Sequence, residues 1–314
     1  MSSIRILKPG MLTSVQDLGR WGFQARGVPV AGPMDPCSHR LANALAGNPR
    51  DAAALEVTLL GPEIEFSDER TLAVAGADFE LSIDGRRAPM HGAVRIRGGE
   101  RLRFGARRSG ARAYLAVSGG IDVPMVLGSR ATHLISAMGG VDGRPLRTGD
   151  RLPLGPAARP APERPPSSPP WMIPSGHAQV RVLPGPQPEY FAADALDVLQ
   201  SARYGVSARS DRMGFRLEGP RLTHDPARGA DIISDATPLG VLQVPASGLP
   251  ILLMADRQTS GGYPKLATVI TADISVAGQL GPGDTLQFVV CTPRQAMAAL
   301  IAQERALMAL EAAV

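Results

Sequence analysis

Lysine is rare in this sequence, and one of its two lysines lies in a loop that could support chemistry. Among the 33 Lys and Arg residues of the 314-residue chain, lysine occurs only at Lys8 and Lys265. Lys265 belongs to the stretch RQTSGGYPKLATV, residues 257–269. A lysine ammonium can give up its proton when it is buried, whereas a guanidinium stays charged. Because arginine supplies almost all other positive charge, we interpret Lys265 as a candidate proton donor or acceptor.

The same loop places neutral hydrogen-bond donors before the lysine. Gln258 and Thr259 precede two glycines, and Tyr263 follows them. A turn with two glycines lets the backbone approach a ligand closely. A plain hairpin turn with a snorkelling surface lysine would give the same pattern, so both interpretations stay open.

A second polar run lies near the N-terminus, in KPGMLTSVQDLGRWGFQARGVPVAGPMD. It sets Thr13, Gln16, Asp17, Arg20 and Asp35 among several glycines. Polar side chains held on glycine-rich loops often form binding sites. The alternative is a strand followed by loops whose polar residues serve as caps and turns.

A third candidate is Arg212 in VSARSDRMGFRLEGP, where it follows Asp211. The guanidinium can hold an anionic substrate group with two parallel hydrogen bonds. An adjacent acid and base more often form a surface ion pair that contributes little stability.

Composition excludes several functional classes. Aromatic residues make up 4% of the chain and the arginines are scattered, so despite a net charge of +4 we expect no nucleic-acid partner. Cys37 and Cys291 show no CxxC spacing and the five histidines lack metal-ligand spacing, so we expect neither a disulfide framework nor a metal site. The sequence also lacks a GxxxxGK[ST] phosphate loop.

Hydropathy predicts a cytoplasmic protein without a membrane segment. No apolar run reaches the roughly 20 residues that a membrane span needs. The start, MSSIRILKPG, lacks the apolar core of a signal peptide.

Proline distribution predicts two domains. The segment PAARPAPERPPSSPP, residues 156–170, favours an extended linker. We therefore predict domains at 1–155 and 171–314. The two halves echo each other, with IRILKPG opening one and VRVLPGP the other, which suggests an internal duplication.

The local patterns predict a mainly β protein. A glycine and an acid precede alternating apolar residues in GERLRF, GDRLPL and GDTLQF, which is typical of a strand that leaves a turn. We expect few helices, at about 38–47, 189–200 and 292–314. In the last of these, Thr292 and Gln295 have the spacing of a capping box.

Six motifs in order resemble the KipA family, whose members are also known as the C subunit of 5-oxoprolinase, as allophanate hydrolase subunit 2 or as the biotin-dependent carboxyltransferase family. The motifs are PGMLTSVQDLGR, GVPVAGPMDPCSHRLANALAGN, LEVTLLGP, YLAVSGGIDVP, SDRMGFRLEGP and RQTSGGYPKLATVI. They cover nearly the whole chain. The resemblance implies two cyclophilin-like β-barrel domains with a few short helices and a C-terminal helix.

The resemblance also implies an activity and partners. Family members act with a KipI-like B subunit and with an A subunit to open 5-oxoproline to glutamate at the expense of ATP, which need not bind to this chain. One alternative is a biotin-dependent carboxyltransferase of the urea carboxylase type, with biotin carried by another chain. Another is a non-catalytic regulatory partner of a KipI-like kinase inhibitor.

For a small amide substrate, the candidate residues divide by role. Lys265 would move a proton or neutralise charge, and Gln258 would hold a developing oxyanion, with Thr259 and Tyr263 binding substrate. Asp35 and Asp211 occupy counterpart loops, and the sequence leaves open which of them acts and which is structural; Asp35 is a catalytic candidate and Asp211 a substrate-binding candidate. The predicted substrate-binding residues are Thr13, Gln16, Asp17, Arg20, Asp211 and Arg212.

Overall fold

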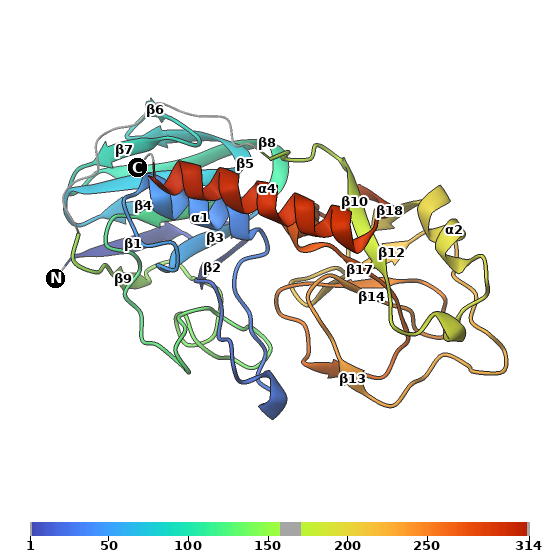
Figure 1. Ribbon diagram of the computed structural model, residues 1–314. Coiled ribbons are helices and arrows are strands. Elements are labelled where there is room, and N and C mark those ends of the chain that lie inside the picture. Colours follow the sequence, from blue (N-terminus) through green and yellow to red (C-terminus); the bar gives the residue numbers. More distant parts are fainter. Residues whose placement is uncertain (1, 158–170, 313–314) are drawn as a thin grey trace. The chain divides into compact units, whose positions relative to one another are not determined.

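The computed structural model describes residues 2–157 and 171–312, and the chain divides into two compact units (Figure 1). The first unit comprises Met1–Arg20, Ala31–Ile173 and Arg305–Val314, and the second comprises Trp21–Val30 and Pro174–Glu304. Except for its first two residues, the predicted linker at 156–170 lies outside the described residues. The domain boundaries at 155 and 171 therefore stay predictions.

A nine-stranded sheet forms most of the first unit. Its strands are β1 (Ser3–Lys8), β2 (Leu12–Gln16), β3 (Ala54–Thr58), β4 (Glu63–Phe66), β5 (Arg70–Ile83), β6 (Arg86–Ala88), β7 (Ala93–Ile96), β8 (Arg101–Val117) and β9 (Arg151–Pro153). The hydrogen-bonded order is β2-β3-β8-β4-β1-β9, and β5 pairs with β6, β7 and β8.

Strand β5 shows how this sheet is buried on both faces. Successive side chains of a strand point to opposite faces. Leu72 and Val74 therefore enter the main apolar core, whereas Ala73 and Ala75 lie in a second core with Leu41 of helix α1 (Pro36–Leu45). The small alanine side chains allow the helix to pack closely on the sheet.

The second unit is a closed barrel of seven strands. These are β10 (His177–Pro184), β11 (Arg203–Val206), β12 (Gly214–Glu218), β14 (Val241–Gln243), β15 (Ile251–Leu253), β17 (Lys265–Val269) and β18 (Thr285–Val290). They close in the order β10-β17-β14-β15-β12-β11-β18. A separate two-stranded sheet joins β13 (Asp235–Ala236) to β16 (Ser260–Gly261).

The three glycine-acid patterns form the turns that the sequence predicts. Gly99, Gly149 and Gly283 have φ of 85°, 93° and 88°, a region that favours glycine. The strands β8, β9 and β18 each begin two residues later. In each turn the acid accepts a hydrogen bond from the backbone N–H three residues before it, at 2.7–2.8 Å.

The described helices agree in part with the predicted ones. They are α1, α2 (Ala195–Ser201), α3 (Ile274–Gly278) and α4 (Pro293–Ala312). The capping box before α4 is confirmed, because Gln295 N donates to Thr292 Oγ1 at 3.2 Å and Thr292 N donates to Gln295 Oε1 at 2.8 Å. The predicted start of α1 at Ser38 is wrong by two residues, since the helix begins at Pro36 and Asp35 is the cap.

The predicted fold class, mainly β with a few short helices and a C-terminal helix, is confirmed. The second unit is a closed barrel, whereas the strand pairings among the described residues of the first unit give a sheet without a closed path. None of the described helices has the length and apolar character needed to cross a membrane.

Candidate functional site

Lys265 is buried at the start of β17, where the register of the barrel is irregular. β17 pairs with β14, and the register shifts so that Gln243 lies opposite Lys265. Bulges of this kind redirect the side chains around them. The Lys265 side chain is 2% exposed. Lysine is rarely buried to this extent without a partner.

Asp235 is the partner of the Lys265 ammonium. Nζ donates to Oδ2 of Asp235 at 3.1 Å, and the side chain of Asp235 is 55% exposed. The pairing of β13 with β16 holds Asp235 opposite Gly261. The hydrogen bond from Lys265 lowers the pKa of Asp235. The Asp235 carboxylate is therefore ionised at neutral pH, and it faces solvent.

Gln258 joins this pair through a second amide. Gln258 Nε2 donates to Gln243 Oε1 at 3.2 Å, and Gln243 is the residue opposite Lys265. A Cβ at Gly261 would lie 2.6 Å from Gln243 Nε2, so only glycine fits there without displacing the amide. We call Asp235, Gln243, Gln258 and Lys265 the Lys265 cluster. The structure thus brings together the two residues of this loop that the sequence singled out as catalytic.

Arg257, beside the cluster in sequence, is buried and was not singled out by sequence reasoning. It is 8% exposed. Its Nε donates to the carbonyl of Thr237 at 2.9 Å, and its Nη1 donates to the carbonyl of Met254 at 3.5 Å. Burial lowers the pKa of Arg257 to about 10, so it remains charged at neutral pH.

Thr259 and Tyr263 make their contacts through their backbones, Tyr263 with Gln243 of the cluster and Thr259 with Thr237. The carbonyl of Thr259 accepts from Thr237 N at 3.1 Å, and the carbonyl of Tyr263 accepts from Gln243 Nε2 at 3.4 Å. Tyr263 is 41% exposed and lines a separate groove of about 450 Å³ with Arg209. The substrate-binding roles of both residues stay predictions.

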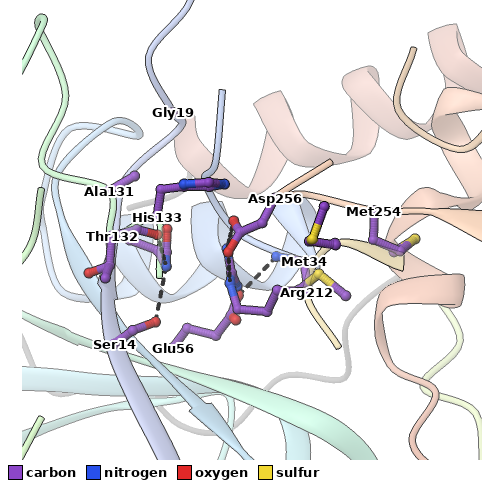
Figure 2. A network of polar contacts seen from close by, with 12 residues as sticks. Ser14, Gly19, Met34, Glu56, Ala131, Thr132, His133, Arg212, Met254 and Asp256 are labelled. Carbon is purple, nitrogen blue, oxygen red and sulfur yellow. Dashed lines mark hydrogen bonds and ion pairs between the residues drawn. The ribbon is translucent and has the colours of Figure 1, made fainter. Parts of the chain in front are cut away.

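Arg212 makes the bidentate contact that its chemistry suggests, with a carboxylate of the same unit. Its Nε and Nη2 donate to the two carboxylate oxygens of Asp256 at 3.0 and 2.9 Å, as Figure 2 shows. Both side chains are almost fully buried. Asp211 is exposed and accepts from the backbone of Met213 and Gly214, which is a turn contact.

In the first unit, Thr13 and Gln16 are fully buried in β2. Thr13 Oγ1 donates to the carbonyl of Pro9 at 2.6 Å. Gln16 Nε2 donates to Ser14 Oγ at 3.0 Å and to the carbonyl of Thr132 at 3.1 Å. Both side chains hold β2 to neighbouring segments.

Asp17 and Arg20 contact the same loop as Gln16. Asp17 accepts from Ser129 Oγ at 2.6 Å and from Arg130 N at 2.5 Å. Arg20 Nη2 donates to the carbonyl of Ala131 at 2.5 Å. The structure therefore gathers three predicted residues around residues 129–132.

Asp35 is the N-cap of α1. Its Oδ1 accepts from Ser38 N at 3.0 Å and its Oδ2 accepts from Ser38 Oγ at 2.5 Å. The backbone N of Asp35 donates to the hydroxyl of Tyr114, which in turn donates to Glu56 at 2.7 Å. Figure 2 shows the contact of Glu56 with the backbone of Met34. A catalytic role for Asp35 stays a prediction, alongside this structural one.

His39 was missed by sequence reasoning, because a lone histidine in a helix carries no spacing signal. It is fully buried, and its Nε2 lies 3.1 Å from the carbonyl of Gln16. Burial lowers the pKa of His39, so the ring is neutral at pH 7. Its edge contacts the ring of Tyr114 at 5.8 Å between centroids.

Comparison with known proteins places these features in a family. The family model "Carboxyltransferase domain, subdomain A and B" matches residues 26–290. The C subunit of the 5-oxoprolinase of Escherichia coli K12 is 38% identical over 308 residues, which is 96% of both chains. The urea amidolyase of Saccharomyces cerevisiae is 35% identical over 92% of this chain, but this covers only 16% of the amidolyase.

Among solved structures, the K. lactis urea amidolyase superposes with a TM-score of 0.90 and 32% identity, over 98% of this chain and 20% of that one. The matched region spans both units and includes every candidate residue from Asp35 to Lys265. The chain therefore belongs to the carboxyltransferase subdomain A and B family.

Proposed function

We propose that this chain is part of a multi-component, ATP-dependent 5-oxoprolinase that opens the ring of 5-oxoproline to give glutamate. It would act in the cytoplasm with a KipI-like B subunit and with an A subunit. The supporting observation is the match over 96% of both chains to a protein named as the C subunit of 5-oxoprolinase. The amidolyase relative is several times longer than the region it shares with this chain.

The Lys265 cluster supports this proposal because ring opening must break an unreactive lactam C–N bond. Negative charge develops on the carbonyl oxygen, and the leaving nitrogen needs a proton. In our proposal the Gln258 amide donates to the oxygen and the Lys265 ammonium supplies charge or the proton. Asp235 would act as a positioning residue that holds the ammonium.

ATP would bind elsewhere in the complex, because the sequence has no phosphate-binding loop of the GxxxxGK[ST] type. We propose that the partner proteins hold it. This chain would then be almost inactive alone.

The family model also favours a second candidate, a carboxyltransferase that acts on a urea-like amide. Neither lysine lies in a biotin-accepting sequence motif, and Lys265 is also buried. If this candidate is correct, biotin would arrive on another chain.

Co-purification with the neighbouring gene products tests these candidates. We expect a stable complex with a KipI-like protein, and ATP hydrolysis that requires 5-oxoproline, this chain and both partners. Urea-dependent consumption of carboxybiotin would favour the carboxyltransferase. A complex without either activity would favour a regulatory role, and full 5-oxoproline turnover when this chain is omitted would overturn the proposal.

A further inference from the structure

Arg257 is a buried cation that no carboxylate of the described residues neutralises. Its side chain makes two hydrogen bonds within the described part of the chain, and both go to neutral backbone carbonyls. Charged groups this deeply buried are nearly always paired with an opposite charge. The position therefore differs from that of Arg212, which has Asp256 on two of its nitrogens.

Two acids of the second unit, one next to Arg257 in the chain and one in the Lys265 cluster, already have partners. Asp256 precedes Arg257 in the chain, but its two oxygens accept from Arg212. Asp235 accepts from Lys265. Each of these pairs is neutral, so one positive charge remains at Arg257.

The guanidinium of Arg257 also has an edge that the fold satisfies only weakly. Nε is held at 2.9 Å by Thr237, which fixes the plane of the group, whereas the contact of Nη1 with Met254 is long, at 3.5 Å. Nη2 has no acceptor among the described residues. It is also not fully buried, so solvent or a ligand can reach it. The Nη1–Nη2 edge can therefore receive a ligand.

We propose that Arg257 binds a carboxylate ligand beside the Lys265 cluster. One uncompensated charge and one weakly satisfied edge suit a planar, singly charged carboxylate, which accepts two parallel hydrogen bonds from a guanidinium. A phosphate dianion would leave a buried negative charge without a partner. This inference rests on the proposed function, in which the ligand is the carboxylate of 5-oxoproline. In the carboxyltransferase alternative, the same chemistry would come from the carboxyl group being transferred.

Binding measurements with paired probes test the site. The probes are 5-oxoproline, 2-pyrrolidinone, which has the same ring without a carboxylate, and bicarbonate. Titration calorimetry is done with the full chain and with its complex. The test variant is Arg257→Met, and the control is Arg203→Met at an exposed arginine of β11.

We expect the wild type to bind 5-oxoproline roughly 10-fold or more tightly than 2-pyrrolidinone, because a hydrogen bond to a charged group contributes at least about tenfold in affinity. Arg257→Met should abolish this preference, and Arg203→Met should keep it. Binding of bicarbonate that depends on Arg257, without binding of 5-oxoproline, would support the site and reject the oxoprolinase substrate. Equal binding of the carboxylate probes by wild type and Arg257→Met, or no binding of either carboxylate by the wild type, would overturn the site.

Thermal unfolding separates this role from a structural one. If Arg257 is kept for a ligand, Arg257→Met removes an unpaired buried charge, and the unfolding temperature without ligand should stay equal or rise. If Arg257 serves only to hold the carbonyls of Thr237 and Met254, the temperature should fall while carboxylate binding stays unchanged, and that result would contradict the proposal. Should Arg257→Met not fold, Arg257→Lys keeps the charge and should retain a weaker preference for the carboxylate.

Discussion

The carboxylates of Asp17 and Asp35 in the first unit accept hydrogen bonds from within the fold, whereas near Lys265 in the second unit one carboxylate is largely exposed and one buried guanidinium has no carboxylate partner among the described residues. Asp17 accepts from Gly19, Ser129 and Arg130, and Asp35 accepts twice from Ser38. In the second unit, the side chain of Asp235 is 55% exposed, and Arg257 has no carboxylate among the described residues.

This difference shows that polar density alone does not identify a site. Both regions combine glycines with charged and amide side chains, and both attracted functional interpretations from sequence. The charged groups separate them, because a buried carboxylate that accepts several hydrogen bonds stabilises a fold, while a buried guanidinium without a carboxylate partner costs stability and needs another reason to persist. The following variants test this comparison.

The largest effect is expected for Lys265→Arg. The guanidinium keeps the positive charge but is wider and does not readily release a proton. We expect 5-oxoproline turnover by the complex to fall about 100-fold or more, the usual loss when a proton-transfer group is removed. The control is Lys8→Arg, since Lys8 is 69% exposed and should tolerate the exchange. Circular dichroism would check that both variants fold.

Near wild-type rates for both lysine variants would remove Lys265 from the chemistry. The loop at 257–269 would then be an ordinary hairpin whose lysine forms a structural ion pair with Asp235.

Asp35→Ala should lower the free energy of unfolding by about 1–2 kcal/mol, because the alanine cannot cap α1. Asp35→Asn keeps an oxygen for Ser38 N and should retain most of the stability. Urea unfolding measures both. If Asp35→Asn lost turnover at unchanged stability, the carboxylate would also act in catalysis. Asp35 would then be more than the structural cap of α1.

His39 should make stability depend on pH below neutrality. Burial lowers the pKa of His39 in the folded chain below 6.5, its value in the unfolded chain. At a pH between the folded and the unfolded pKa, the unfolded chain therefore binds a proton that the folded chain does not. The contribution of neutral, buried His39 to the free energy of unfolding is complete above pH 6.5. As the pH falls from 6.5 toward the folded pKa, the free energy of unfolding decreases by up to about 1.4 kcal/mol per pH unit. Urea unfolding of wild type and His39→Gln from pH 7.5 to 5 checks this, and parallel curves would refute it.

The smallest effect is expected for Asp211→Ala. Asp211 is exposed, and within the described part of the chain its carboxylate accepts only from the backbone of its own turn. We expect a change in unfolding free energy within roughly 0.5 kcal/mol. If Asp211→Ala lowered the free energy of unfolding as much as Asp35→Ala does, both aspartates would stabilise their loops to the same extent, and the expectation would be wrong.

Local sequence signals predicted local structure well. The Thr292–Gln295 capping box and the three glycine-acid turns each depend on residues within four positions of one another, so the pattern alone specifies the contacts. The start of α1 was misjudged because Asp35 and Ser38 are both good caps, and the proline between them favours the earlier one.

The candidate site could be predicted only in part, because its contacts are distant in sequence. Lys265 and Asp235 are 30 positions apart, and Arg212 and Asp256 are 44 apart. Arg257 stands out only once Asp256 is known to be held by Arg212. Sequence spacing cannot show that the carboxylate of Asp256 already accepts hydrogen bonds from Arg212.

The most direct test of the account is a crystal structure of the complex with 5-oxoproline bound. The account predicts that the lactam oxygen lies within hydrogen-bond distance of Gln258 or Lys265 and that the carboxylate lies against the Nη1–Nη2 edge of Arg257. A ligand that contacts none of these three residues would contradict it.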